Sequence, residues 1–185
     1  MCLIIIDIQN DYFAGGTMEL VGMAEAAANA RLLLDAHRAA GLPVIHVQHL
    51  AARPGATFFI PGTPGAEINR AVAPIAAEPV VVKHFPNSFR DTGLLDLLES
   101  KQAKNLTICG AMSHMCIDTT VRAAFDLGFT CTLAADACAT RDLAFEGRVV
   151  PAADVHAAYM AALSLPFARV TNTSNIIEEL GPFVA

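Results

Sequence analysis

Short runs of Val, Ile and Leu that alternate with longer helical segments set the strongest limit on how this chain can fold. The runs are Cys2–Ile6, Pro43–Gln48, Pro79–Lys83, Leu106–Cys109, Phe129–Ala134 and Ala168–Thr171. Most of them lack the polar–apolar alternation of a half-exposed strand, which indicates strands that are buried on both faces. Such strands require a layer of helices above and below their sheet.

The segments between the runs have the length and pattern of helices. They are Gly22–Ala40, Thr92–Ser100, Cys116–Leu127, Pro151–Leu163 and a short segment through Leu180 that Thr173 or Ser174 could cap. The 185 residues contain no linker and no internal repeat, which predicts one domain over residues 1–185. We therefore expect a three-layer α/β/α fold around a mostly parallel sheet of six strands.

Composition narrows the classes of partner. The chain has 12 Lys and Arg against 18 Asp and Glu, a formal net charge of −6, and this acidic balance argues against nucleic acid. Its apolar runs are far shorter than the roughly 20 residues that cross a bilayer, and no basic leader precedes the first run. Five cysteines without close pairing fit reduced thiols. These features predict a cytoplasmic protein without a nucleic-acid or membrane partner, and the apolar excess favours a homo-oligomer, either a dimer or a tetramer.

Three reactive side chains follow strands of the predicted sheet. Asp7 ends the first strand, Lys83 ends the third, and Cys116 follows the fourth after the stretch 110–115. Ligands of open parallel sheets bind beyond the carboxyl ends of the strands, so we expect these three groups to converge there. Each also has an ordinary alternative: the acid as a loop cap, the lysine extended into water, the thiol as a small buried apolar group.

Cys116 is the sharpest candidate for a nucleophile because it opens a predicted helix. The positive end of the helix dipole, together with a nearby lysine, should lower the pKa of the thiol. The amides of the same helix end are placed to hold an oxyanion. We expect Cys2, Cys109 and Cys131 to be buried in strands, whereas Cys138 follows strand five and could border the site.

The Gly/Pro-rich stretch Ala51–Gly65 interrupts the alternation. A connection of this length favours a lid or binding loop, but a loop whose aromatic residues tuck into the core or a subunit contact is equally open. Several side chains could line a pocket for a flat or apolar acyl group, with simple burial as the alternative in each case. They are Tyr12, Phe13, His49, Phe58, Phe59, Phe89 and His114.

Cofactor motifs are missing from the expected places. The first strand is followed by Asp-Ile-Gln-Asn and not by the glycine-rich dinucleotide fingerprint, and no phosphate-binding loop motif occurs. The Gly-x-Ser-x-Gly motif of serine hydrolases is missing as well. We expect no cofactor.

Three motifs in order resemble the isochorismatase-like cysteine hydrolases. They are Asp7 in Ile-Ile-Asp-Ile-Gln-Asn-Asp-Tyr-Phe, Lys83 before His-Phe-Pro-Asn-Ser-Phe, and Cys116 in Gly-Ala-Met-Ser-His-Met-Cys. The resemblance extends over nearly the whole chain, including Asp136 to Thr140 and His156. This superfamily includes nicotinamidases, carbamoylsarcosine and ureidoacrylate amidohydrolases, and streptothricin hydrolase.

The resemblance implies a sheet order of 3-2-1-4-5-6 and a cis peptide bond between Ala111 and Met112. It also implies roles: Asp7 accepts the thiol proton, Lys83 holds the acid and the thiolate, and Cys116 attacks a carbonyl. The amides of Met112 and Cys116 would hold the oxyanion. The predicted activity is hydrolysis of a C–N bond in a small amide or ureide through a thioester.

The metal site of nicotinamidases is not expected here. Those enzymes use an Asp-x-His pair after the second strand, where this chain has His49 and Ala51. This departure argues against nicotinamide as the substrate. His46, His49, His84 and His114 could in principle gather around zinc, but His46 and His49 are three residues apart and should face opposite sides of a strand. We therefore expect no bound metal, and we expect His49, His84 and His114 to form hydrogen bonds around the site or to pack near it.

Two other functions stay open at this point. Hydrolysis of a vinyl ether of the isochorismate type needs no thiol nucleophile. A catalytically idle binding or scaffold protein could keep the fold, although it would not need Asp7, Lys83 and Cys116 together.

Overall fold

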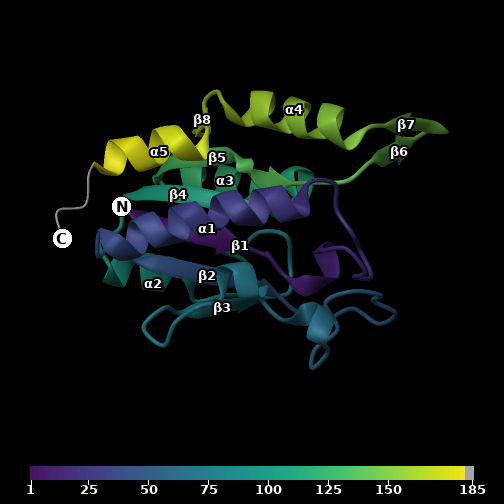
Figure 1. Ribbon diagram of the computed structural model, residues 1–185, viewed down its shortest axis with the longest axis horizontal. Coiled ribbons are helices and arrows are strands. Elements are labelled where there is room, and N and C mark those ends of the chain that lie inside the picture. Colours follow the sequence, from purple (N-terminus) through teal and green to yellow (C-terminus); the bar gives the residue numbers. More distant parts are fainter. Residues whose placement is uncertain (182–185) are drawn as a thin grey trace.

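A single parallel sheet of six strands forms the centre of the molecule (Figure 1). The computed structural model describes residues 1–181, so residues 182–185 of the predicted domain lie outside the described part. The strands of this sheet are β1 (Cys2–Ile6), β2 (Val44–His49), β3 (Val80–Lys83), β4 (Asn105–Ala111), β5 (Thr130–Ala139) and β8 (Arg169–Thr171). Their order is β3-β2-β1-β4-β5-β8, which confirms the predicted topology with β8 as the sixth strand.

Helices cover both faces of the sheet. One face carries α1 (Met23–Ala39) and α5 (Thr173–Leu180), and the other carries α2 (Leu94–Ser100), α3 (Asp118–Asp126) and α4 (Ala152–Leu163). The three-layer α/β/α prediction is therefore confirmed. Within residues 1–181, no helix combines the length and the apolar character needed to cross a membrane.

The central strand β1 is apolar throughout because its side chains are buried on both faces of the sheet. Ile4 and Ile6 belong to the core beneath α2 and α3, whereas Leu3 and Ile5 belong to the core beneath α1, and all four are at most 2% exposed. Each such side chain contributes about 2 kcal/mol through burial. A polar residue at any of these positions would lose that contribution on one face or the other.

The structure adds elements that the sequence analysis did not predict. Strand β5 continues to Ala139 and does not stop at Ala134, because Cys138 and Ala139 still pair with Gly110 and Ala111 of β4. A hairpin of β6 (Leu143–Phe145) and β7 (Arg148–Val150) projects from the body (Figure 1). Its turn residues Glu146 and Gly147 both have positive φ, 48° and 78°, as two-residue hairpin turns require.

Strands β1 and β4 approach each other closely where the site begins. Gly110 pairs with Ile6, has a φ of +130°, and leaves no room for a Cβ atom, which would collide with the carbonyl oxygen of Ile6. The register of β4 against β5 shifts at the same point. Glycine is therefore required here for both conformation and space.

Replacing Gly110 by Ala should destabilise the protein by about 3 kcal/mol, because the new methyl group must displace the backbone of β1. Urea unfolding measures the loss. The control is Gly93→Ala, since Gly93 has a φ of −87° and open space around its Cα. Equal stabilities for the two variants would contradict the close approach of β1 and β4.

Candidate active site

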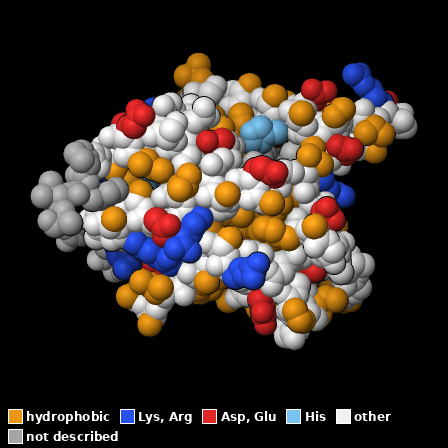
Figure 2. Space-filling model, in the orientation of Figure 1, with side chains coloured by type: hydrophobic (Ala, Val, Ile, Leu, Met, Phe, Trp, Pro, Cys, Tyr) orange, Lys and Arg blue, Asp and Glu red, His pale blue; other side chains and the backbone are white. Residues whose placement is uncertain are grey.

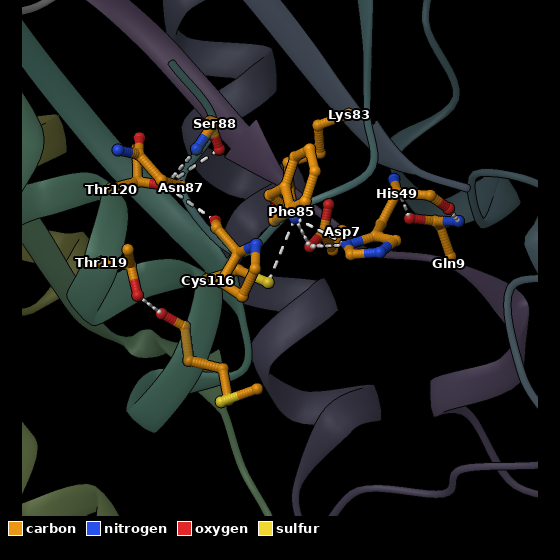
Figure 3. A network of polar contacts seen from close by, with 12 residues as sticks. Asp7, Gln9, His49, Lys83, Phe85, Asn87, Ser88, Cys116, Thr119 and Thr120 are labelled. Atoms are coloured by element: carbon orange, nitrogen blue, oxygen red, sulfur yellow. Dashed lines mark hydrogen bonds and ion pairs between the residues drawn. The ribbon is translucent and has the colours of Figure 1, made fainter. Parts of the chain in front are cut away.

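Asp7, Lys83 and Cys116 lie together beyond the carboxyl ends of β1, β3 and β4. The Lys83 Nζ atom is 2.7 Å from Asp7 Oδ2 and 3.1 Å from Cys116 Sγ (Figure 3). Asp7 and Lys83 are fully buried, and Cys116 is 4% exposed. The convergence expected from the strand ends is thus present as direct contact.

The backbone at Asp7 is specialised. Its φ is +54°, a region that residues other than glycine seldom adopt, while its N–H still donates to the Val47 carbonyl at 3.0 Å. The hydrogen bonding between β1 and β2 therefore continues to Asp7, the residue at which the chain turns away from the sheet. Conformations of this kind concentrate at functional sites, where the surrounding structure holds them in place.

The Lys83 ammonium group lies at the centre of the site and has four acceptors around it. Besides Asp7 and Cys116, His49 Nδ1 lies 2.9 Å from Nζ and the Phe85 carbonyl oxygen lies 3.1 Å from it. Burial alone lowers the pKa of Lys83, but Asp7 and Cys116 outweigh burial and raise the pKa above its ordinary value. The lysine is therefore charged.

A metal ion has no vacant place among these groups. Ligand-type atoms of Asp7, His49 and Cys116 lie within 4.8 Å of one another, the kind of cluster that can hold a cation. Lys83 Nζ contacts all three residues, so the cation at their centre is the protein's own ammonium. His46 faces away from this cluster and its Nε2 lies 2.9 Å from Glu78.

The expected low pKa of Cys116 is wrong. Burial raises the pKa of this thiol, the Asp7 carboxylate raises it further, and Lys83 opposes both without overcoming them. The helix end is also less regular than predicted: Cys116 lies in a π-helical turn, Ser113–Ile117, that precedes α3. At rest the sulfur therefore carries its proton, and the negative charge beside Lys83 belongs to Asp7.

The same turn contains the predicted oxyanion donors. The peptide bond between Ala111 and Met112 is cis. The Met112 carbonyl accepts hydrogen bonds from the N–H groups of Met115 at 3.0 Å and Ile117 at 3.2 Å. The chain thus wraps around Met112, which places the Met112 and Cys116 amides in one tight turn.

His49 is held in place by a residue that the sequence analysis did not single out. The Gln9 side chain accepts from the His49 N–H at 2.8 Å and donates to the His49 carbonyl at 2.8 Å (Figure 3). Gln9 is fully buried and also donates to the Ala66 carbonyl at 2.7 Å. Its position two residues after Asp7 is the only sequence signal for this role.

A cavity of about 500 Å³ opens beside the buried triad. Its lining residues are His49, Ala51, Ala52, Arg53, Ala56, Phe58, His84, Phe85, Pro86 and Met115. Met115 precedes Cys116 in the chain, and His49 and Phe85 contact Lys83, so the cavity adjoins the triad. The loop Ala51–Gly65 supplies half of this lining, as the binding-loop hypothesis requires.

Two of the predicted pocket residues, His49 and Phe58, border this cavity. Tyr12 and Phe59 are buried instead and support the Phe58 ring, with centroids 6.1 and 5.0 Å from it. The loop therefore serves both as cavity wall and as core, through neighbouring aromatic residues. Phe13 is partly buried against the same core.

The other two candidates lie elsewhere. Phe89 stacks on Phe129 at 6.1 Å between centroids, in the core beneath α3. His114 Nδ1 lies 2.6 Å from Thr140 Oγ1, toward β5. Neither residue is part of the cavity wall, because both side chains turn toward neighbouring elements of the fold.

Asp11 anchors the loop that forms the cavity wall. One carboxylate oxygen accepts from the Phe59 N–H at 2.7 Å, and the other accepts from the Thr17 hydroxyl at 2.8 Å. Gly65 passes so close that a Cβ atom there would collide with the Asp11 carboxylate. The Asp11 carboxylate therefore fixes the backbone of the loop at Phe59.

Known proteins share both the sequence and the fold. The isochorismatase domain matches residues 1–175. An isochorismatase family protein of Bacillus subtilis, YddQ, is 48% identical over 95% of this chain and 98% of its own. A crystal structure from Oleispira antarctica, named for the same hydrolase family, has 50% identity and a TM-score of 0.93, covering 96% of this chain and 95% of its own. Streptothricin hydrolase of Streptomyces noursei is 38% identical over 76% of this chain and 50% of its own. The chain belongs to the isochorismatase family of hydrolases.

Replacing Asp7 by Asn should lower the pKa of Cys116 by about 1–3 units, because the variant keeps the Lys83 charge and loses the carboxylate that opposes ionisation. The rate of Cys116 alkylation by iodoacetamide, followed by mass spectrometry from pH 6 to 10, reports this pKa. The Asp7→Asn midpoint should lie below that of the wild type, and the Lys83→Met midpoint above it. Cys116→Ala identifies the labelled thiol. An Asp7→Asn midpoint equal to or above the wild-type value would contradict the arrangement of charges.

Proposed function

We propose that this hydrolase cleaves a C–N bond of a small amide or ureide, with Cys116 as nucleophile, Asp7 as general base and acid, and Lys83 as the fixed cation between them. The observation that carries the proposal is the position of Lys83 Nζ, 2.7 Å from the acid and 3.1 Å from the sulfur in a buried site. A single cation thus serves two acidic groups, of which one is ionised at a time.

The first step forms a thioester. Asp7 takes the proton from the Cys116 thiol as the sulfur attacks the substrate carbonyl carbon, and the carbonyl π electrons move to oxygen. Negative charge passes from the carboxylate to the sulfur and the substrate, while Lys83 stays beside both. The amides of Met112 and Cys116 hold the oxyanion. When the carbonyl reforms, the C–N bond breaks and Asp7 returns the proton to the leaving nitrogen.

The second step regenerates the thiol. Asp7 accepts a proton from water as the water oxygen attacks the thioester carbon, and the C–S bond breaks. The sulfur recovers its proton from Asp7, so the site returns to a thiol beside an ion pair.

The proton that Asp7 takes from the thiol makes an amine a suitable leaving group for this site. An amide nitrogen must be protonated to leave, and Asp7 holds the former thiol proton at that moment. Alkoxide leaving groups depend on this proton less strongly. The similarity to a protein named streptothricin hydrolase, which is 38% identical to this chain, supports hydrolysis.

We further propose that the protein acts in the cytoplasm as a homo-oligomer. Its five described cysteines are free, as a reducing compartment requires. Exposed apolar side chains support association: Leu165 is 81% exposed and Phe145 72%. Figure 2 shows hydrophobic side chains over the hairpin and α4 as well as over the main body. Gel filtration with light scattering tests the oligomeric state.

Cys116→Ala should lower hydrolysis of a responsive substrate at least about a thousandfold, and Asp7→Asn at least about a hundredfold. The assay is a panel of small amides and ureides, with intact mass spectrometry to detect the acyl adduct on Cys116. Cys131→Ala, which removes another buried thiol, is the matched control and should retain both turnover and adduct. Wild-type turnover by Cys116→Ala would refute the proposal.

A further inference from the structure

The hydrogen bond between Lys83 and His49 determines where the imidazole carries its proton. An ammonium group only donates hydrogen bonds, so Nδ1 of His49, 2.9 Å from Nζ, must accept and cannot carry a proton. Burial and the Lys83 charge lower the pKa of His49 to about 4, against an opposing effect of Asp7. At neutral pH the ring is therefore uncharged, with its one proton on Nε2.

The ring is also fixed in orientation. Gln9 binds both backbone groups of His49 at 2.8 Å, and the Phe59 ring lies against the imidazole with 5.8 Å between centroids. Figure 3 shows the Gln9 and Lys83 contacts, and together with the Phe59 ring they hold the backbone, the ring face and one edge of the side chain. Such prior fixation is what a group that positions a ligand needs.

The free edge of the ring borders the cavity. His49 is a lining residue, its side chain is 19% exposed, and no group within residues 1–181 forms a hydrogen bond with Nε2. The lining contains no carboxylate. Its charged or ionisable members besides His49 are Arg53, which is a donor, and His84, whose Nδ1 donates to the Leu50 carbonyl at 2.7 Å. The Nε2 proton of His49 therefore has no partner among the described residues, and solvent or a bound ligand can accept it.

We propose that His49 is a substrate-positioning residue that donates its Nε2 proton to an acceptor atom of the bound amide, and that substrates of this site carry an oxygen or nitrogen acceptor in addition to the scissile carbonyl. This inference rests on the proposed hydrolysis at Cys116. It assigns the chemistry of the substrate portion that lies in the cavity. Because the same ring accepts from Lys83, it links the position of the substrate to that of the ammonium.

The proton position is measurable without a substrate. Nitrogen-15 NMR of the histidine side chains should show His49 as the Nε2–H tautomer from pH 6 to 8, with no titration near the ordinary pKa of about 6.5. In Lys83→Met, the charge that lowers the pKa of His49 is lost and Asp7 remains, so titration should move to higher pH. An Nδ1–H tautomer, or a wild-type ring that titrates near 6.5, would overturn the proposal.

Two conservative variants separate the two edges of the ring. Asn at position 49 places its oxygen near Nδ1 and can still accept from Lys83, whereas Gln places its amide nitrogen near Nε2 and can still donate into the cavity. On the best amide of the panel, His49→Asn should raise KM about tenfold with little change in kcat, and His49→Gln should keep KM within about threefold. Equal effects of the two variants on KM would overturn the proposal, since a purely structural role does not discriminate between the edges.

A second probe is independent of the proposed function. Iodoacetate and iodoacetamide alkylate the same sulfur, but only iodoacetate carries an anionic acceptor. The ratio of their rates at Cys116 should fall about tenfold in His49→Asn and stay near the wild-type value in His49→Gln. If no amide is hydrolysed, the proposed function fails while this ratio still tests the donor. An unchanged ratio in His49→Asn would overturn the role of His49.

Discussion

A buried ammonium group organises this molecule. Removing Lys83 from water costs several kcal/mol, and that cost is tolerable only because Asp7 lies 2.7 Å away and three further acceptors surround Nζ. The ion pair joins the end of β3 to the end of β1, across β2. The thiol beside it keeps its proton because a second anion would exceed what one cation can compensate. The charges of Asp7, Lys83 and Cys116 are therefore coupled, and a change in any one of these side chains alters the other two.

The fold was predictable because its signal lies in the core. Continuous apolar runs such as that of β1 have few alternatives to a sheet covered on both faces, and the strand ends then place Asp7, Lys83 and Cys116 at one edge. The hairpin escaped prediction because its strands are three residues long and its turn reads Glu-Gly, where Asn-Gly or Asp-Gly would be the usual signal. The extension of β5 escaped because alanine and cysteine carry little preference for strands.

The convergence of Asp7, Lys83 and Cys116 was predictable from the sequence, but the surroundings of these residues were not. The three central residues stand at strand ends, where topology alone positions them. The cavity wall depends on how the loop 51–65 folds. Tyr12 and Phe59 are buried in the core, whereas Phe58 lines the cavity. The direction of the Cys116 pKa was wrong because the helix end and Lys83 were weighed without the cost of burial and the repulsion from Asp7. Those two effects depend on depth and distance, which a sequence does not contain.

The loop that bounds the cavity has a consequence for how this scaffold can change. Asp11 fastens it at Phe59 and Gln9 fastens it at Ala66, while the alanines and Arg53 before Phe58 take no part in either attachment. The side chains of Ala51, Ala52, Arg53 and Ala56 can therefore be changed in size or charge with the anchors and the buried triad left intact. A library restricted to these positions would vary the shape and charge of the cavity beside an unchanged triad, which makes this short segment the natural place to redirect the hydrolase toward new molecules.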